Sequence, residues 1–226
     1  MIHVCKESRK VDPGLVEKFR SLTVATVYEA SGRKGFIDNA IKPAARGIRI
    51  CGPALTVQCA PGDNLMLHKA LQCASAGDVL VASVGEEPEY GYWGALMATA
   101  GMAKGLEGLA IDGCVRDSAE IIEMSFPVFC RGFCIRGTTK TVLGLINYPL
   151  NFGHVTVFPG DLILGDDDGM VVVRYEECQE VLEKSLRRVQ LEDTKAAQLK
   201  KGVSSVELNS LEKVFESLGM AEEDKA

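Results

Sequence analysis

One region of the sequence restricts the fold more than any other. Between residues 61 and 130, helix-like and apolar strand-like segments alternate three times, about 25 residues apart. The strand-like segments are 79–84, 109–111 and 127–130, and the helix-like segments are 61–76, 93–104 and 117–124. Strands that alternate with helices in this way are usually parallel and joined by right-handed crossovers. The pattern therefore predicts an α/β fold with a parallel strand–helix core.

The flanking regions follow other patterns. Short apolar segments at 154–158, 162–164 and 170–173 are separated by Pro, Gly and Asp residues, which is typical of antiparallel strands. Upstream, Asp12-Pro13 predicts the start of a helix, a second helix covers 24–30, and 47–59 forms two strands or one bent strand. Charged helices are expected over 176–200 and from Ser204 onward. We expect a layered mixed sheet in one domain, 1–226, with 175–226 as a helical C-terminal arm. The arm packs either on its own domain or against a neighbouring subunit.

Composition excludes several classes of function. The 226 residues include 25 Lys and Arg against 31 Asp and Glu, a net charge of −6, with no basic stripe for nucleic acid. Charged residues interrupt every apolar run before it reaches the length of about 20 residues that crosses a membrane, and the N-terminus has no apolar signal region. We expect a soluble, cytoplasmic protein. Eight Cys without a CxxC motif predict buried free thiols, and three scattered His disfavour a zinc site.

The segment 90–117 holds the best candidates for a functional site. Gly94 stands at a helix start that follows a strand, so nearby N–H groups can form an anion site; the alternative is that Gly94 only permits close helix packing. Arg116 and Asp117 open the next helix at the same end of the sheet, where Arg116 could reach that anion. Asp117 could hold Mg²⁺ with water and substrate oxygens; alternatively the pair is a helix cap with a surface charge. The candidate anion-binding residues are Gly94, Ala95, Leu96 and Met97.

Three other signals are open to more than one interpretation. The Asp166–Gly169 segment lacks the spacing of a calcium loop, so a hairpin turn is the prediction. Lys69, Lys104 and Lys140 raise the possibility of a Schiff base; among them only Lys140 lies near a strand end. His68 could face the crevice as an acid or base, although a hydrogen-bonded helix histidine is the favoured interpretation.

Taken together, these motifs resemble a known family. The pattern G-(x)21-R-D-x-x-E, formed by Gly94, Arg116, Asp117 and Glu120, is similar to that of class II pyruvate aldolases. These enzymes cleave 4-hydroxy-4-methyl-2-oxoglutarate and 4-carboxy-4-hydroxy-2-oxoadipate, and they share their swivelling β/β/α fold with regulators of ribonuclease activity. Further matches are at 25–32, 52–57, 61–64, 126–129 and 159–169, and the resemblance covers about residues 14 to 200.

The resemblance implies a lyase. The backbone of 94–97 and the Arg116 side chain would hold the pyruvyl group, and Asp117 would ligate Mg²⁺ or Mn²⁺. Retro-aldol cleavage and oxaloacetate decarboxylation would pass through the same pyruvate enolate. A metal-bound water is the implied base, positioned by Asp117, Glu120 or Glu192.

The resemblance also implies partners and a pathway. Family members form homotrimers or homohexamers with active sites between subunits, and Glu192 is the best match for an acid from the neighbouring arm. Degradation of aromatic compounds is the implied pathway. The competing interpretation is a non-catalytic regulator of ribonuclease activity that binds a protein partner, which would need the fold but not the metal carboxylate.

Overall fold

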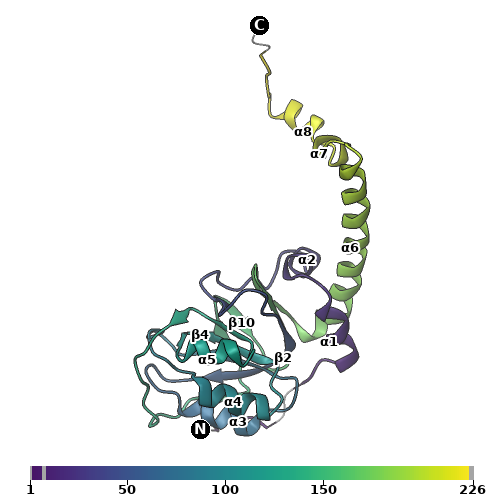
Figure 1. Cartoon of the computed structure of the whole chain (residues 1–226). Helices are drawn as coiled ribbons and strands as arrows, with labels where there is room; N and C mark the ends of the chain where they lie inside the picture. The colour runs from purple at the N-terminus through teal and green to yellow at the C-terminus, as the bar shows by residue number, and fades with distance from the viewer. Residues whose placement is uncertain (1, 7–8, 224–226) are drawn as a thin grey trace. The chain divides into compact units, whose positions relative to one another are not determined.

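The computed structural model describes residues 2–6 and 9–223 (Figure 1). The chain divides into two compact units, one ending at Ser185 and the other beginning at Leu186. The second unit begins inside helix α6 (Cys178–Lys200), since the first turns of this helix bury Val181 and Leu182 in the first unit. The single domain with an arm from residue 175 stays a prediction.

The first unit is built around an eight-stranded mixed sheet, with the strand order β1-β6-β4-β3-β2-β11-β12 and β8 paired to β2. Neighbours among β2, β3, β4 and β6 are parallel, which confirms the predicted core. Strand β11 is antiparallel to both β2 and β12, which confirms the mixed sheet. The strands of this sheet are β1 (Lys42–Pro43), β2 (Ile50–Gln58), β3 (Val79–Ser83), β4 (Gly108–Asp112), β6 (Val128–Cys130), β8 (Leu145–Ile146), β11 (Leu162–Asp166) and β12 (Gly169–Val173).

Strand β2 joins the parallel and antiparallel parts of the sheet. Its first half pairs with β11, as in Cys51 opposite Leu164, and its second half pairs with β3, as in Leu55 opposite Leu80. The region 47–59 is therefore one strand, which Pro53 does not interrupt although proline cannot donate to the ladder.

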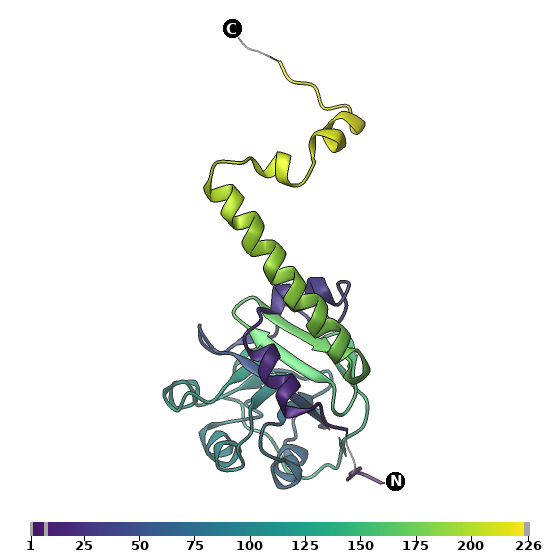
Figure 2. The same cartoon turned by 90° about the vertical axis from the view of Figure 1, so that its right-hand side faces the viewer.

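Helices cover one face of the sheet and a hairpin covers the other. Because side chains alternate along a strand, Leu80 faces the helices whereas Val79 and Val81 face away. Helices α3 (Leu65–Cys73) and α4 (Ala95–Ala103) lie side by side in both views (Figure 1, Figure 2), and α4 also contacts α5 (Ser118–Glu123). On the opposite face, the small hairpin of β9 (Leu150–Phe152) and β10 (Val155–Val157) packs against β3. The layers are thus β/β/α, as expected.

The two helices predicted near the N-terminus are present. Asp12 caps α1 (Pro13–Arg20) by accepting a hydrogen bond from the Leu15 N–H at 3.1 Å, and α2 (Val24–Ala30) follows. A second pair of short strands, β5 (Cys114–Val115) and β7 (Gly132–Phe133), forms a separate two-stranded sheet, and a 3₁₀ turn, η1 (Tyr175–Glu177), precedes α6. All eight cysteines are free, and five of them are buried.

The second unit corrects one prediction. Ser204 caps a helix as expected, by accepting a hydrogen bond from the Glu207 N–H at 3.0 Å, but the helix expected from Ser204 onward is not continuous. It ends as α7 (Ser205–Leu208), and α8 (Glu212–Ser217) follows after a break. Ser210 has a positive φ of 52°, which a helix cannot accommodate.

Candidate active site

A cavity of about 230 Å³ lies beyond the carboxyl ends of β3 and β4. This edge of an open α/β sheet is where ligands usually bind. The cavity contains four of the five predicted substrate-binding residues, together with Asp117. It is lined by Asn64, His68, Gly91, Tyr92, Gly94, Leu96, Met97, Arg116, Asp117, Gly137, Thr138 and Lys140.

Two glycines allow the Arg116–Asp117 segment to approach α4. A Cβ atom at Gly94 would lie 2.4 Å from Asp117 Oδ2, and one at Gly91 would lie 2.9 Å from Arg116 Cβ and 2.6 Å from the Cys134 carbonyl oxygen. Gly94 itself is extended, with a φ of −141°, so steric space rather than backbone conformation requires glycine there.

Arg116 and Asp117 are held by contacts with the start of α4. The Arg116 N–H donates to the Trp93 carbonyl at 2.9 Å. Asp117 Oδ2 accepts from the Ala95 N–H at 3.1 Å and lies 3.8 Å from Arg116 Nε. Both side chains remain about half exposed, so solvent and a ligand can reach them.

The N–H groups at the start of α4 are not all free, in contrast to the prediction. Besides the Ala95 N–H, which Asp117 occupies, the Met97 N–H donates to the Gly94 carbonyl at 3.1 Å. Within the described part of the chain, the N–H groups of Gly94 and Leu96 make no hydrogen bond. These two donors, at the positive end of the helix dipole, are the ones a carboxylate can use.

The donor set of this cavity fits a hard divalent cation better than zinc. Asp117 is the only carboxylate in its lining, and its Oδ1 atom accepts no hydrogen bond from any described residue. Nowhere in residues 2–6 and 9–223 do three His, Cys, Asp or Glu side chains gather as a metal cluster. One carboxylate supplemented by water and substrate oxygens suits Mg²⁺ or Mn²⁺.

The loop 137–142 contributes residues that sequence reasoning weighed lightly. Buried Asp63 holds this loop, because its Oδ2 accepts from the Thr141 N–H at 2.6 Å, from the Thr139 hydroxyl at 2.8 Å and from the Val142 N–H at 3.2 Å. Burial raises the pKa of the Asp63 carboxyl, but these hydrogen bonds outweigh it and leave the pKa below its ordinary value. The loop carries Lys140 into the cavity.

Residues Asn64 and His68 enter the same cavity from α3 and its cap. The Asn64 side chain is buried and donates from Nδ2 to the Tyr92 carbonyl at 2.8 Å, while its Oδ1 has no partner among the described residues. The ring of His68 makes no hydrogen bond in the described structure, contrary to the favoured interpretation of its role. The sequence analysis assigned no role to Asn64, although this residue follows an acid before a helix and lies in the matching segment 61–64.

Neither of the other predicted acids lines this cavity. Glu120 is an exposed residue of the first turn of α5. Glu192 belongs to the second unit, where its Oε1 lies 2.7 Å from Arg188 Nε. Its approach to the active site of a neighbouring subunit stays a prediction.

A sequence model described as "RraA-like: Aldolase/RraA" matches residues 24–172, which include the sheet core and the whole cavity. The chain belongs to the RraA-like family. A Halalkalibacterium halodurans protein named "Putative 4-hydroxy-4-methyl-2-oxoglutarate aldolase" is 37% identical over 175 residues, covering 76% of this chain and 82% of the relative. A Deinococcus radiodurans protein with the same name is 33% identical over 128 residues, covering 57% of this chain and 79% of the relative.

Solved structures support the RraA-like fold. A Streptomyces coelicolor protein described as an unusual member of the RNase ES inhibitor RraA protein family has a TM-score of 0.76 at 26% identity, covering 84% of this chain and 99% of its own. An uncharacterized Pseudomonas syringae protein has a TM-score of 0.78 at 26% identity, covering 87% and 96%. The names of RraA-like relatives therefore indicate an aldolase-type enzyme, on a fold shared with ribonuclease inhibitors.

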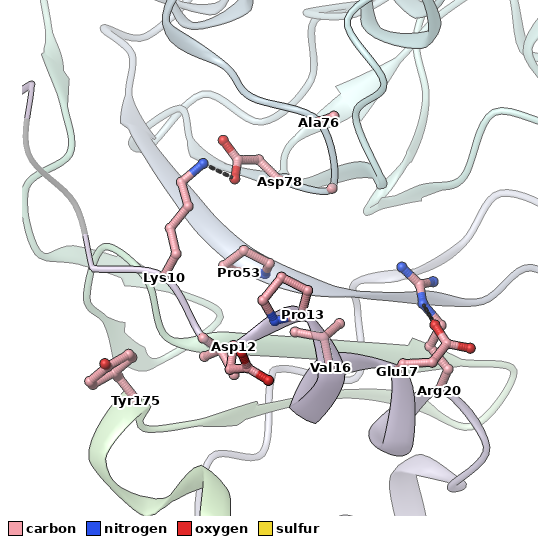
Figure 3. Close-up of a pocket in the computed structure, with 12 residues that line it drawn as sticks. Lys10, Asp12, Pro13, Val16, Glu17, Arg20, Pro53, Ala76, Asp78 and Tyr175 are labelled. Atoms are coloured by element: carbon pink, nitrogen blue, oxygen red, sulfur yellow. Dashed lines mark hydrogen bonds and ion pairs between the residues drawn. The ribbon is translucent and has the colours of Figure 1, made fainter.

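A larger cavity of about 570 Å³ in the RraA-like chain lies at the opposite ends of the strands (Figure 3). Its buried carboxylate, Asp78, is occupied by Lys10 Nζ at 2.8 Å and by the Ser75 N–H at 2.9 Å. On its other side, Arg20 pairs with Glu17 and Glu107. None of the predicted site residues lines it, so volume alone does not identify the active site.

The Asp166–Gly169 segment forms the predicted hairpin turn. Asp166 and Gly169 face each other across the β11–β12 hairpin, which confirms a turn rather than a calcium loop. Among the helices that the structure describes, we find none with the length and apolar character to traverse a bilayer.

Proposed function

We propose that this chain is a divalent-metal-dependent lyase. It would cleave 4-hydroxy-4-methyl-2-oxoglutarate or 4-carboxy-4-hydroxy-2-oxoadipate to pyruvate and a second 2-oxo acid, and it would also decarboxylate oxaloacetate. One observation carries the proposal: the start of α4, Arg116 and Asp117 line a single small cavity in which a carboxylate and a cation can be held together.

The residues of the cavity have distinct tasks in this proposal. The N–H groups of Gly94 and Leu96 bind the substrate carboxylate, since they are free donors at a helix start. The planar guanidinium of Arg116 donates to the oxygen on which negative charge develops. Asp117 would hold the cation through Oδ1, with its carboxylate oriented by the Ala95 N–H. When bound, a divalent cation would supply Lewis-acid polarisation of the 2-oxo group.

The aldol cleavage and the decarboxylation of oxaloacetate would form the same enolate. In the aldol cleavage, the C3–C4 bond breaks and its electron pair becomes the enolate of pyruvate. In oxaloacetate decarboxylation, the bond to the departing carboxylate breaks and leaves the same enolate. Arg116 stabilises that enolate in each case, so a single site can catalyse both.

The proposal includes self-association into a homotrimer or homohexamer. Exposed apolar side chains beside the cavity support it, with Leu96 87%, Ile135 95% and Phe133 53% exposed. Such a patch is typical of a contact surface. A neighbouring subunit would cover this patch and bring an acid such as Glu192 to the site.

The direct test is turnover by the purified full-length protein. Pyruvate production from oxaloacetate and from each 4-hydroxy-2-oxo diacid is followed with and without Mg²⁺, and then after addition of EDTA. Metal-dependent release of pyruvate that EDTA abolishes is the expected result. If neither class of substrate gave such turnover, the enzyme proposal would be wrong and the regulator interpretation would be favoured.

A further inference from the structure

The cavity contains a histidine, the side chain most often used to move a proton in catalysis. His68 lies on α3, one turn after the Asn64 cap, and faces the same cavity as Arg116 and Asp117. His68 is an exposed residue, and its ring makes no hydrogen bond to a described residue. A histidine that only stabilised α3 would be expected to have a partner; this one is open to a ligand.

We propose that His68 is the general base and acid of the aldol cleavage, taking the proton from the C4 hydroxyl and returning one to C3. This inference rests on the proposed function. It replaces the implied water with a side chain of this chain and separates the two reactions of the site, because oxaloacetate has no C4 hydroxyl proton to remove.

The step balances within the site. His68 takes the hydroxyl proton, and the O–H electron pair forms the carbonyl of the departing 2-oxo acid. The C3–C4 electron pair becomes the pyruvate enolate, which Arg116 stabilises. The imidazolium then donates its proton to C3, giving the methyl group of pyruvate and restoring neutral His68, so no other reactant is needed.

The electrostatic surroundings favour a neutral imidazole, which a base must have. Burial lowers the pKa of His68, and the positive charge of Lys140 lowers it further. The other charged groups lining the cavity are Arg116 and Asp117; Lys69, the next residue on α3, is tied to Gln72 Oε1 at 2.6 Å. The loop held by Asp63 thus places Lys140 in the cavity that His68 lines.

The test compares His68→Asn with the same substitution at His154, an 84% exposed residue outside the cavity. We expect His68→Asn to lower kcat/KM for 4-hydroxy-4-methyl-2-oxoglutarate by about 100-fold or more, the lower end of acid–base contributions, and to change oxaloacetate consumption by less than about threefold. His154→Asn should leave both unchanged. Equal losses with both substrates, or no loss with either, would overturn the assignment.

A second measurement does not depend on turnover. Because the chain has three histidines, the imidazole signals can be assigned by NMR from the two Asn variants. The pKa of His68 should lie below the ordinary histidine value and rise in Lys140→Gln, and the acid limb of kcat/KM should move to higher pH in the same variant. An unmoved His68 pKa and acid limb in Lys140→Gln would count against the inference.

These experiments distinguish failure of the proposed lyase function from failure of the role assigned to His68. Absence of metal-dependent turnover in the wild-type protein would refute the proposed function, and this inference with it. Wild-type turnover of both substrates together with a folded, fully active His68→Asn protein would refute the inference alone.

Discussion

Replacing Gly94 by Ala tests whether the close approach of Asp117 to α4 matters for turnover. The added Cβ would lie 2.4 Å from Asp117 Oδ2, whereas ordinary contacts begin at 3.4 Å, so the carboxylate must retreat by about 1 Å. Arg116 Cγ and Nε, each 3.3 Å from the new atom, would also have to adjust. The backbone itself tolerates Ala, because Gly94 has an extended conformation.

A displacement of about 1 Å at reacting groups can cost about 100-fold in rate, equivalent to about 2.7 kcal/mol. We expect this loss in kcat/KM for oxaloacetate with Mg²⁺, measured by coupling pyruvate to NADH oxidation. Stability should change little, since the Asp117 side chain is 41% exposed and its interactions are screened. The midpoint of thermal unfolding should fall by no more than about 4 °C.

Gly137→Ala is the matched control, because it adds the same methyl group to the same cavity. There the nearest atom is Arg116 Nη1 at 4.0 Å, an ordinary contact, so a much smaller loss is expected than for Gly94→Ala. If folded Gly94→Ala kept the kcat/KM of the wild type, the contact between Asp117 and α4 would have no role in turnover.

Three further predictions concern single side chains. Arg116→Lys should lose at least about 2 kcal/mol of transition-state stabilisation, because an ammonium cannot donate the two parallel hydrogen bonds of a guanidinium; a wild-type rate would contradict the role proposed for Arg116. Asp117→Ala should abolish turnover, with poor rescue by added Mg²⁺ in a metal titration. Asp63→Asn should be destabilised at neutral pH in urea unfolding. Because the pKa of Asp63 is lowered in the folded protein, its carboxylate stabilises the fold above the unfolded pKa of about 3.9. This contribution to the free energy of unfolding should vanish as the pH falls through the folded pKa. A difference in the free energy of unfolding between wild type and Asp63→Asn that did not change with pH would contradict this origin.

The sequence could predict the core and the meeting of Gly94 with Arg116 because both depend on local patterns. Apolar periodicity determines each strand and helix, and the preference for right-handed crossovers places successive helix starts at one edge. The structure has these features within a few residues of the predicted bounds.

What could not be predicted depends on contacts between distant parts of the chain. Asp63 binds Thr141, which lies 78 positions away, and this contact helps to place Lys140 in the cavity that His68 lines. The hydrogen bond from the Ala95 N–H to Asp117 could not be predicted either, because the sequence indicates free donors at a helix start but not which of them a side chain will occupy. These two contacts determine which N–H donors and charged side chains of the cavity remain available to a ligand.

The backbone at Asp117 links the geometry of the site to its chemistry. This residue has a φ of 55° and a ψ of 41°, a left-handed conformation that Asn, Asp and Gly adopt with the least strain. The turn directs the carboxylate back to the Ala95 N–H while the next residues begin α5. Among the three residues suited to this conformation, only Asp brings a charge. Asn would keep the turn and could accept the same hydrogen bond, so Asp117→Asn separates position from charge in a way that Asp117→Ala cannot. A folded Asp117→Asn protein without metal-dependent turnover would show that the charge, rather than the turn, is what the site requires.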